Sequence, residues 1–392
     1  MIRFAPLFLL LAAAPTPSPV DTDGVVTLAP DSEARWVAFD LTPGNQIRFA
    51  MAIDRQPVVA VLDTGVSYSV LARASTLADP ARIEQGGNAS AIGGSVAVGW
   101  LPTREMTIGG LTRRGGKVSV ADLPALATGS AKAVDLLVGR DVTGGQALDI
   151  DYANRRFRLL PSGRMPFVGS VAPLAISAQR RVYESAVTLG ARTLAPMIVD
   201  TGDGSAMTVT DAAWRGANLA GLPTTTTVSF GLAGPTVSTL AIVPSVSIGA
   251  QAARNVELRV EPADGFSQSI GVAGRIGSGF LQNYRVLLDP PARRMVLSPG
   301  PGADRPPARS TSGLLLGLDH QRLRVLHVMR GSPAAASGWR AGEEICTIDG
   351  AAVPADYAVS PVASWSIGTP GRSVALGLCD GTTRALTLAR FY

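Results

Sequence analysis

A duplicated motif constrains this chain more than any other feature of its sequence. Asp63 begins the triplet DTG after the apolar run VVAVL, and Asp200 begins a second DTG after APMIV, 137 residues later. At ordinary residue usage a single DTG arises by chance in roughly one chain of this length in ten or twenty. One copy would therefore indicate no more than a turn, whereas two copies need a common explanation.

Further matches at almost the same offset extend the repeat. Gly139 in LLVGRD aligns with Gly277 in GRIGSGF, and Asp151 in DIDYANRRFRLLP aligns with Asp289 in VLLDPPARRMVLSP, each at an offset of 138 residues. Self-similarity sustained over about 130 residues is the signature of a repeated structural unit. We therefore expect two homologous lobes, each built from strands, turns and a Gly-rich segment.

The composition favours many short strands over long helices. The chain has 392 residues, of which 43 are Gly and 28 are Pro, and 46% are hydrophobic. Frequent turn residues between short apolar runs are typical of β proteins, and this length predicts two or three domains. We expect an all-β dominated fold, with short helices only near residues 71–78 and 210–214.

Charge and metal-ligating residues exclude several classes of function. The net charge of +5 comes from scattered arginines, and none of the basic pairs is interleaved with aromatic residues. A nucleic-acid partner is therefore not expected. The only histidines, His320 and His327, do not lie at a metal-ligand spacing, so we expect no metal and no cofactor.

The N-terminus has the pattern of a secretory signal peptide. Residues 1–14, MIRFAPLFLLLAAA, place one arginine before a short apolar segment that ends in small residues. We expect residues 15–30 to be a flexible mature N-terminus and the protein to be secreted or periplasmic in a bacterium. No other segment has 18 uninterrupted apolar residues, so we expect no stable membrane insertion of the mature chain.

The two DTG copies predict a chemical site. A buried aspartate costs several kcal/mol unless it is paired, hydrogen-bonded or protonated. Two carboxyls about 3 Å apart share one proton, so that one activates water while the other protonates a carbonyl oxygen. Glycine permits a tight turn and close approach, and threonine can bond across the lobe interface. The candidate residues are the catalytic pair Asp63 and Asp200 and the supporting loop residues Thr64, Gly65, Thr201 and Gly202.

These features resemble the aspartic proteases, and the retropepsin-like branch more closely than the pepsin branch. The resemblance rests on the two apolar-DTG loops, on LLVGRD, and on AIGGS, in which Ile92, Gly93 and Gly94 resemble a β-hairpin flap. It implies a peptide-bond hydrolase with two acid-protease-like β lobes, residues 31–165 and 166–300, and the active site between them. One chain supplies both aspartates, and the implied partner is a polypeptide substrate.

Departures from the family pattern leave alternatives open. Val66 and Asp203 follow the two DTG triplets where the pepsin branch has a hydroxyl residue, and Asp203 adds a third carboxylate. The second repeat lacks an arginine after the glycine of GRIGSGF, and its flap candidate GLAGP contains proline. A catalytically impaired peptide-binding protein and a structural scaffold are the alternatives. Two intact DTG triplets favour the enzyme.

A third unit follows the linker at residues 301–311. Within residues 312–392, GSPAAASGWRAGEEICTIDGAAV resembles the signature of bacterial PDZ domains, except that Trp339 replaces the usual aliphatic residue. The resemblance implies a small β-sandwich or barrel with short helices that captures a peptide or protein C-terminus as an added strand. The alternative is a domain that only packs against the lobes. The implied peptide-binding residues are Gly313, Leu314, Leu315, Leu316 and Gly317.

The only cysteines, Cys346 and Cys379, both fall in this third unit. An oxidising compartment would permit a disulfide between them, but free buried cysteines are also common. A bridge requires Cα atoms within about 7 Å, so the sequence leaves both states open.

Overall fold

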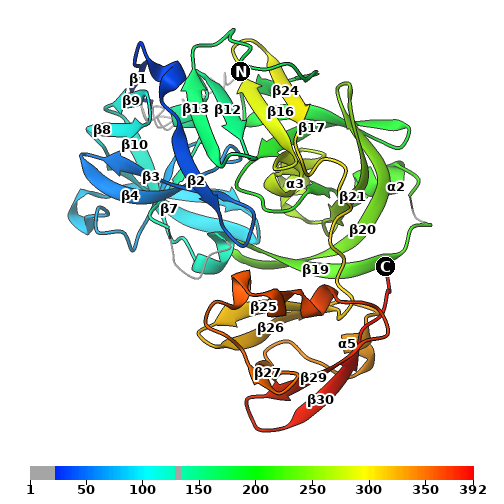
Figure 1. Cartoon of the computed structure of the whole chain (residues 1–392). Coiled ribbons are helices and arrows are strands. Elements are labelled where there is room, and N and C mark those ends of the chain that lie inside the picture. Colours follow the sequence, from blue (N-terminus) through cyan, green and yellow to red (C-terminus); the bar gives the residue numbers. More distant parts are fainter. Residues whose placement is uncertain (1–22, 129–133, 220) are drawn as a thin grey trace, which may run out of the picture.

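The computed structural model describes residues 23–128, 134–219 and 221–392, and strands dominate it (Figure 1). The all-β character expected from composition is confirmed. The short helices are α1 Arg140–Thr143, α2 Asp211–Gly216, α3 Phe266–Ser269, α4 Ser278–Leu281 and α5 Pro333–Ala336, with 3-10 turns η1 Ser32–Ala34, η2 Pro80–Arg82, η3 Ala125–Thr128, η4 Tyr357–Val359 and η5 Pro361–Ile367.

The first part of the chain forms strands whose inward side chains build the core. In β3, for example, alternate residues are buried, as in an amphipathic strand. The strands are β1 Val25–Leu28, β2 Val37–Leu41, β3 Ile47–Ile53, β4 Gln56–Leu62, β5 Val70–Ala72, β6 Glu84–Ala91, β7 Gly94–Pro102, β8 Glu105–Ile108, β9 Leu111–Arg114, β10 Lys117–Ala121, β11 Leu136–Val138, β12 Ala147–Asp151 and β13 Arg156–Leu160.

The second and third parts are also built from strands. The second part contains β14 Ser170–Pro173, β15 Ala175–Ile176, β16 Tyr183–Leu189, β17 Arg192–Asp200, β18 Met207–Val209, β19 Thr224–Gly231, β20 Gly234–Ile248, β21 Gln251–Val260, β22 Gly274–Gly277, β23 Tyr284–Asp289 and β24 Arg294–Pro299. The third contains β25 Leu314–Asp319, β26 Arg322–Val328, β27 Glu344–Ile348, β28 Ala351–Ala352, β29 Ser373–Leu378 and β30 Thr383–Thr387.

The first two parts have equivalent strand pairings around their DTG segments. β11 lies between β4, to which it is parallel, and β5, to which it is antiparallel. β22 lies in the same way between β17 and β18. The aligned glycines Gly139 and Gly277 both sit in extended backbone at the start of a short helix, α1 or α4. The sequence offset therefore corresponds to the same place in each part.

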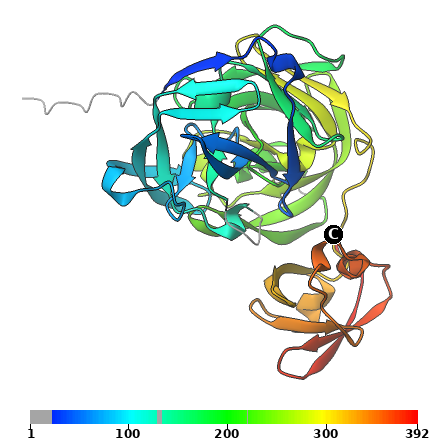
Figure 2. The ribbon, with the colours of Figure 1, turned by 60° about the vertical axis from the view of Figure 1, so that its left-hand side comes forward.

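A shared sheet joins these two parts. β12 pairs antiparallel with β23, so that Leu148 lies opposite Leu288, and β13 and β24 extend the sheet on either side. Asp149 of β12 is fully buried and pairs with Arg285 of β23 at 2.9 Å. A continuous apolar core contains residues of both parts. In Figure 2 the strands of these two parts together form one body, and the third part lies apart from it.

Two local predictions are wrong, and one is confirmed. Residues 25–28 were expected to be flexible, but they form β1, which pairs with β9, and Val26 and Leu28 pack on the core. Residues 1–14 and 15–22 lie outside the described part. Residues 71–78 form no helix, since β5 is inserted between β10 and β11 and tertiary burial overrides the local pattern. The helix near 210–214 is confirmed as α2, which Thr210 caps by accepting from the Ala213 N–H.

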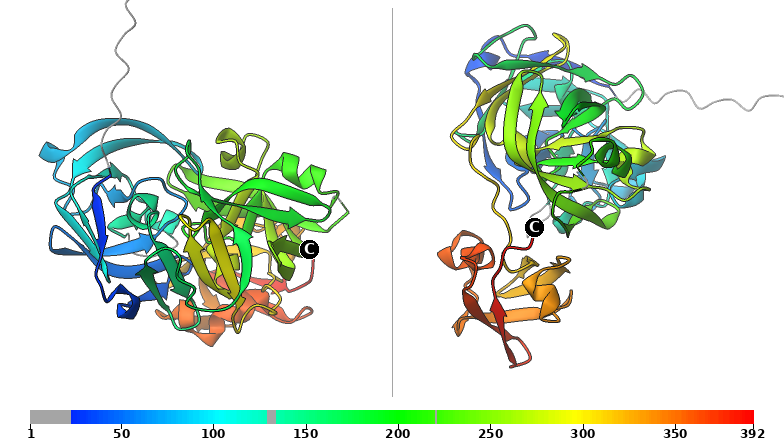
Figure 3. Two further views of the ribbon diagram at one scale, coloured as in Figure 1. Left: turned by 90° about the horizontal axis from the view of Figure 1, so that it is seen from above. Right: turned by 90° about the vertical axis from the view of Figure 1, so that its right-hand side faces the viewer.

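The third part is a separate sheet with its own core, and it lies beside β19 (Figures 1 and 3). Its strand order is β25-β26-β27-β29-β30. Trp339, the residue that departs from the PDZ signature, is buried in this core. Thr311, assigned to the linker, is also buried and donates its N–H to the Ser366 carbonyl. Thr311 therefore belongs to the third part and not to the linker, and Ser310 before it already donates its N–H to Tyr392 Oη.

Hydrogen bonds connect the third part to the start of β19. Thr226 Oγ1 lies 2.8 Å from His327 Nε2, and Thr225 Oγ1 donates to the Arg330 carbonyl at 2.8 Å. The Arg330 N–H in turn donates to Thr226 Oγ1 at 3.1 Å. The third part is thus held to β19 by these hydrogen bonds as well as by the chain segment that begins at residue 301.

Cys346 and Cys379 form a disulfide with a Cα–Cα distance of 5.1 Å. We expect thiol titration of the unfolded, unreduced protein to detect no free thiol and to detect two after reduction. Reduction should destabilise the third part by about 3–4 kcal/mol, because the bond closes a loop with a sequence separation of 33 residues. Two free thiols before reduction would contradict the bridge.

Candidate active site

The two DTG triplets fold as facing loops at the ends of equivalent strands. β4 ends immediately before Asp63, and β17 ends at Asp200. Both aspartates are buried, with 9% and 7% of their surface exposed. The last residues before each aspartate, Ala60–Leu62 and Met197–Val199, are buried where β4 and β17 pair with β11 and β22. The apolar runs therefore serve to place two carboxyls inside the protein.

Reciprocal hydrogen bonds between the threonines hold the loops together. Thr64 Oγ1 donates to the Val199 carbonyl at 2.6 Å and accepts from the Thr201 N–H at 3.0 Å. Thr201 Oγ1 donates to the Leu62 carbonyl at 2.7 Å and accepts from the Thr64 N–H at 3.0 Å. Both threonines are fully buried. Each hydroxyl thus donates one hydrogen bond and accepts another across the junction of the two parts.

The glycines leave room for the opposite carboxyl. A Cβ built on Gly65 would lie 2.4 Å from Cγ of Asp200, and one built on Gly202 would lie 2.3 Å from Cγ of Asp63. Each aspartate also accepts the N–H of its own loop glycine, at 3.0 Å for Asp63 and 2.9 Å for Asp200. The structure therefore brings all six predicted loop residues together at one place.

Gly202→Ala should displace Asp63 and reduce any reaction that needs the pair by about a hundredfold or more. Its effect on the melting temperature should be smaller, because the atoms in the way belong to a side chain. The matched control is Gly145→Ala, where no heavy atom lies within 4 Å of the added Cβ. Equal activity of both variants would contradict the close approach of Asp63 to Gly202.

The electrostatics of the pair favour a shared proton. Burial, and then the charge of Asp200, raise the pKa of Asp63 well above its usual range. Burial, and then the charge of Asp203, raise the pKa of Asp200 to about 6. Two adjacent carboxyls in a buried site do not both ionise readily. The arrangement can therefore hold one acid and one base side by side near neutral pH.

The segments behind the DTG loops are also equivalent. The Arg140 N–H donates to the Val66 carbonyl at 3.1 Å, and the Ser278 N–H donates to the Asp203 carbonyl at 2.7 Å. LLVGRD and GRIGSGF thus support their loops in the same way, although only the first has an arginine after the glycine. Ser278 Oγ adds a bond to the Thr201 carbonyl at 2.7 Å.

The predicted flap residues lie at the tip of a hairpin that meets a second hairpin. Ala91 pairs with Gly94 at the end of β6 and β7, which places Ile92 and Gly93 in the turn. The tip of β19 and β20 contacts it, because the Ala233 N–H donates to the Ile92 carbonyl at 3.2 Å. A Cβ on Gly231 would lie 2.1 Å from that same carbonyl oxygen. The two Gly-rich segments noted in the sequence are therefore touching tips.

The predicted peptide-binding residues of the third part have mixed environments. β25 pairs with β26 on one side only, so its other edge has no strand partner among the described residues. Leu315, Leu316 and Gly317 are partly exposed, whereas Leu314 is buried in the core. The Gly313 and Leu314 N–H groups donate to Ser310 Oγ and Ser312 Oγ. A peptide carboxylate would have to replace these serines.

Sequence reasoning missed Arg275, which is buried beside Asp203. Arg275 Nε lies 2.9 Å from Asp203 Oδ2, and its Nη1 lies 2.6 Å from Glu261 Oε1. Burial raises the pKa of Asp203, but the charges of Arg275 and Arg259 and the hydrogen bonds from Ser205 together outweigh that effect, and the net shift is downward. The available signal was a charged residue in GRIG at the place of an apolar residue in LLVG.

No protein-family model matches this chain, and a search of curated proteins found no match. Within the described residues, no group of three or more His, Cys, Asp or Glu side chains is arranged to hold a metal ion. None of the helices in that same part of the chain has the length and apolar character needed to cross a membrane.

Proposed function

We propose that this protein is an exported aspartic endopeptidase that hydrolyses peptide bonds with water activated between Asp63 and Asp200. The observation that carries the proposal is the pair of buried carboxyls, each lying against the glycine of the opposite DTG loop. In the reaction one carboxylate takes a proton from water as its oxygen attacks the peptide carbon. The other carboxyl protonates the carbonyl oxygen. The first carboxyl then gives the proton it took from water to the nitrogen, the C–N bond breaks and the amine leaves, while the other carboxylate regains a proton from the diol as the product carboxyl forms.

The proposed architecture is that of two retropepsin-like lobes, residues 31–165 and 166–300, in one polypeptide. Equivalent pairings of β4, β5 and β11 with β17, β18 and β22 support it. We assign the touching hairpin tips, which include Ile92, Gly93 and Gly94, the role of flaps over a bound polypeptide. A hairpin contact that is mainly glycine and backbone suits a cover that must open and close.

We propose that residues 312–392 are a PDZ domain that recruits peptides or protein C-termini. The free edge of β25 and the partly exposed Leu315 and Leu316 support strand addition. The alternative, a domain that only packs on the rest of the protein, is favoured by its contacts with β19. Binding of C-terminal peptides to the full chain, measured with and without Leu316→Lys, separates the two.

A catalytically impaired peptide-binding protein is the main alternative, and a scaffold braced by the DTG loops is another. Asp203 motivated the first of these, but Arg275 neutralises it within an ion pair. The deciding experiment is digestion of a peptide library by the purified mature protein between about pH 3 and pH 8. Cleavage that Asp63→Asn abolishes supports the enzyme, and binding without cleavage supports the impaired form.

Export to the periplasm or the exterior is part of the proposal. It rests on the signal-peptide pattern of residues 1–14 and agrees with a disulfide in the third part. The mature chain should begin shortly after Ala14. Mass spectrometry of cytoplasmic protein that retains Met1 would contradict it.

A further inference from the structure

The two parts differ in charge directly behind their otherwise equivalent DTG loops. Leu137 lies opposite Val61 in the first part, and Arg275 lies opposite Ile198 in the second, at the same position of the parallel ladder. Val66 and Leu137 belong to one apolar cluster. Their counterparts, Asp203 and Arg275, form a buried ion pair at 2.9 Å. An apolar contact in one part is thus an ion pair in the other.

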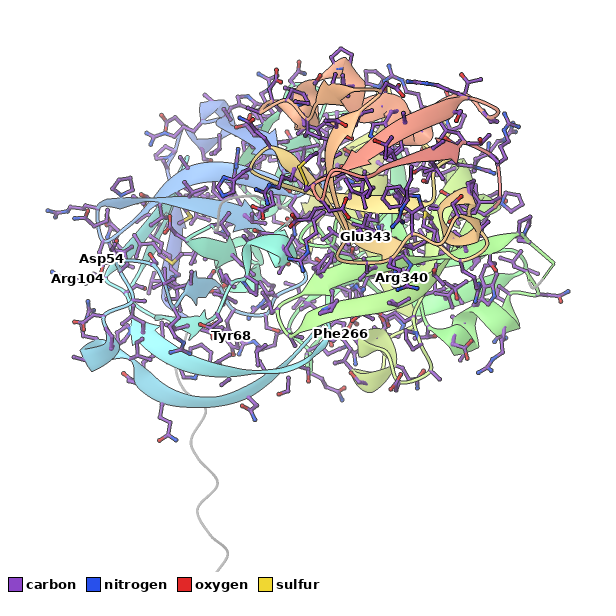
Figure 4. The ribbon with its side chains drawn as sticks, turned by 90° about the horizontal axis from the view of Figure 1, so that it is seen from below. Asp54, Tyr68, Arg104, Phe266, Arg340 and Glu343 are labelled. Carbon is purple, nitrogen blue, oxygen red and sulfur yellow. A yellow bond between two sulfur atoms is a disulfide. The ribbon has the colours of Figure 1, made fainter. Side chains whose placement is uncertain are left out.

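Several further contacts hold this ion pair in place. Besides Asp203, Arg275 bonds to Glu261 Oε1 at 2.6 Å and to Ser267 Oγ at 2.8 Å. Glu261 Oε2 in turn accepts the Ser267 N–H at 2.8 Å. The ring of Phe266, labelled in Figure 4, lies over the guanidinium carbon at 5.4 Å. These contacts hold the charge of the Arg275 guanidinium beside Asp203.

The fixed charge lies close to only one of the two catalytic candidates. Arg275 Nε is 3.9 Å from Asp200 Oδ2, and no ion pair to Asp63 occurs among the described residues. Asp200 also accepts two backbone N–H bonds, from Gly202 and Asp203, at 2.9 and 3.0 Å. Asp63 accepts one, from Gly65 at 3.0 Å. Arg275 and the second N–H bond therefore favour a negative charge on Asp200 over one on Asp63, while the nearby Asp203 carboxylate opposes that charge.

We propose that Arg275 is a positioning residue: it offsets the Asp203 carboxylate, so that the additional N–H bond to Asp200 leaves Asp200 as the ionised base and Asp63 as the carrier of the proton. The assignment rests on the proposed function for its role in catalysis, while the inequality itself is a property of the folded site. Water then loses its proton to Asp200, and Asp63 donates to the carbonyl oxygen.

The charged groups around Asp200 act in opposite directions. Asp203, on the same loop, raises the pKa of Asp200, and Arg275 of β22 lowers it. Asp63 faces it from the other loop. Farther out, Arg259 of β21 lowers the pKa of Asp203, and Glu261 is paired with Arg275. Removing Asp203 and removing Arg275 should therefore shift the titration of Asp200 in opposite directions.

The test combines pH–rate profiles with carbon-13 titration of labelled aspartate carboxyls, assigned by their loss in Asp63→Asn and Asp200→Asn. We expect Asp200 to ionise at lower pH than Asp63. Asp203→Asn should move the Asp200 titration and the acid limb of the profile down by about one pH unit. Arg275→Gln should move both up by a similar amount. The control, Asp211→Asn, removes an exposed ion pair and should shift neither.

Arg275→Gln leaves Asp203 and Glu261 without their cation and is the variant that can fail to fold. The triple variant Asp203→Val with Arg275→Leu and Glu261→Gln removes both carboxylates together with their cation, and the effects of losing Asp203 and Arg275 on the Asp200 titration should nearly cancel. Ionisation of Asp63 before Asp200, or no downward shift in Asp203→Asn, would overturn the inference. Because the carboxyl titration needs no turnover, it separates a failure of this inference from a failure of the proposed activity.

Discussion

Asp63→Asn and Asp200→Asn are each expected to reduce peptide cleavage by at least about a thousandfold, because each removes one partner of an acid–base pair. An asparagine can neither take a proton from water nor supply one to the carbonyl oxygen. The measurement is the rate of cleavage of one peptide by wild type and both variants across the same pH range. Substantial cleavage by either variant would contradict the assignment of the pair.

The same two variants should be as stable as wild type or more stable. Burial raises the pKa of both carboxyls, so the folded protein retains protons that the unfolded chain releases above about pH 4. Wild type therefore loses stability as the pH rises through the raised pKa values. Asparagine does not titrate, so the gain in melting temperature should be a few degrees near pH 7 and should vanish below about pH 4.

Thr64→Val and Thr201→Val should each destabilise the protein by about 2–5 kcal/mol. Valine has nearly the shape of threonine but leaves one buried N–H and one buried carbonyl of the opposite loop without partners. Urea unfolding at fixed pH measures the change in the free energy of unfolding. Thr27→Val, where the side chain is exposed, is the control and should change it by less than about 0.5 kcal/mol. Equal effects would indicate that the loops do not bond across the junction.

The repeat in the sequence predicted correctly which residues lie together, because residues at the same offset occupy the same position in the two sets of strands. Asp151 and Asp289 each end a strand, and each pairs with an arginine five residues later, at 3.4 and 3.5 Å. All six DTG residues meet, as expected from two symmetric loops. The helix predicted at residues 71–78 is wrong, because a buried three-residue strand has the same apolar composition as a short helix.

Other features depend on distances that a sequence does not contain. Nothing in either repeat indicates that β12 would pair with β23, since each strand already has a partner within its own part. Arg275 is one charged residue in an apolar motif, and its meaning depends on its closeness to Asp203. The disulfide required a Cα–Cα distance, which only the fold supplies.

Strand β19 has contacts at both of its ends. Its first residues hold His327 and Arg330 of the third part, and its last residue lies at the tip that meets Ile92. A strand within a hairpin is stiff along its length. Any swing of this tip must therefore either drag the third part with it or break the contacts at its base. Movement of the hairpin tip and movement of the disulfide-bonded third part are therefore mechanically coupled through β19.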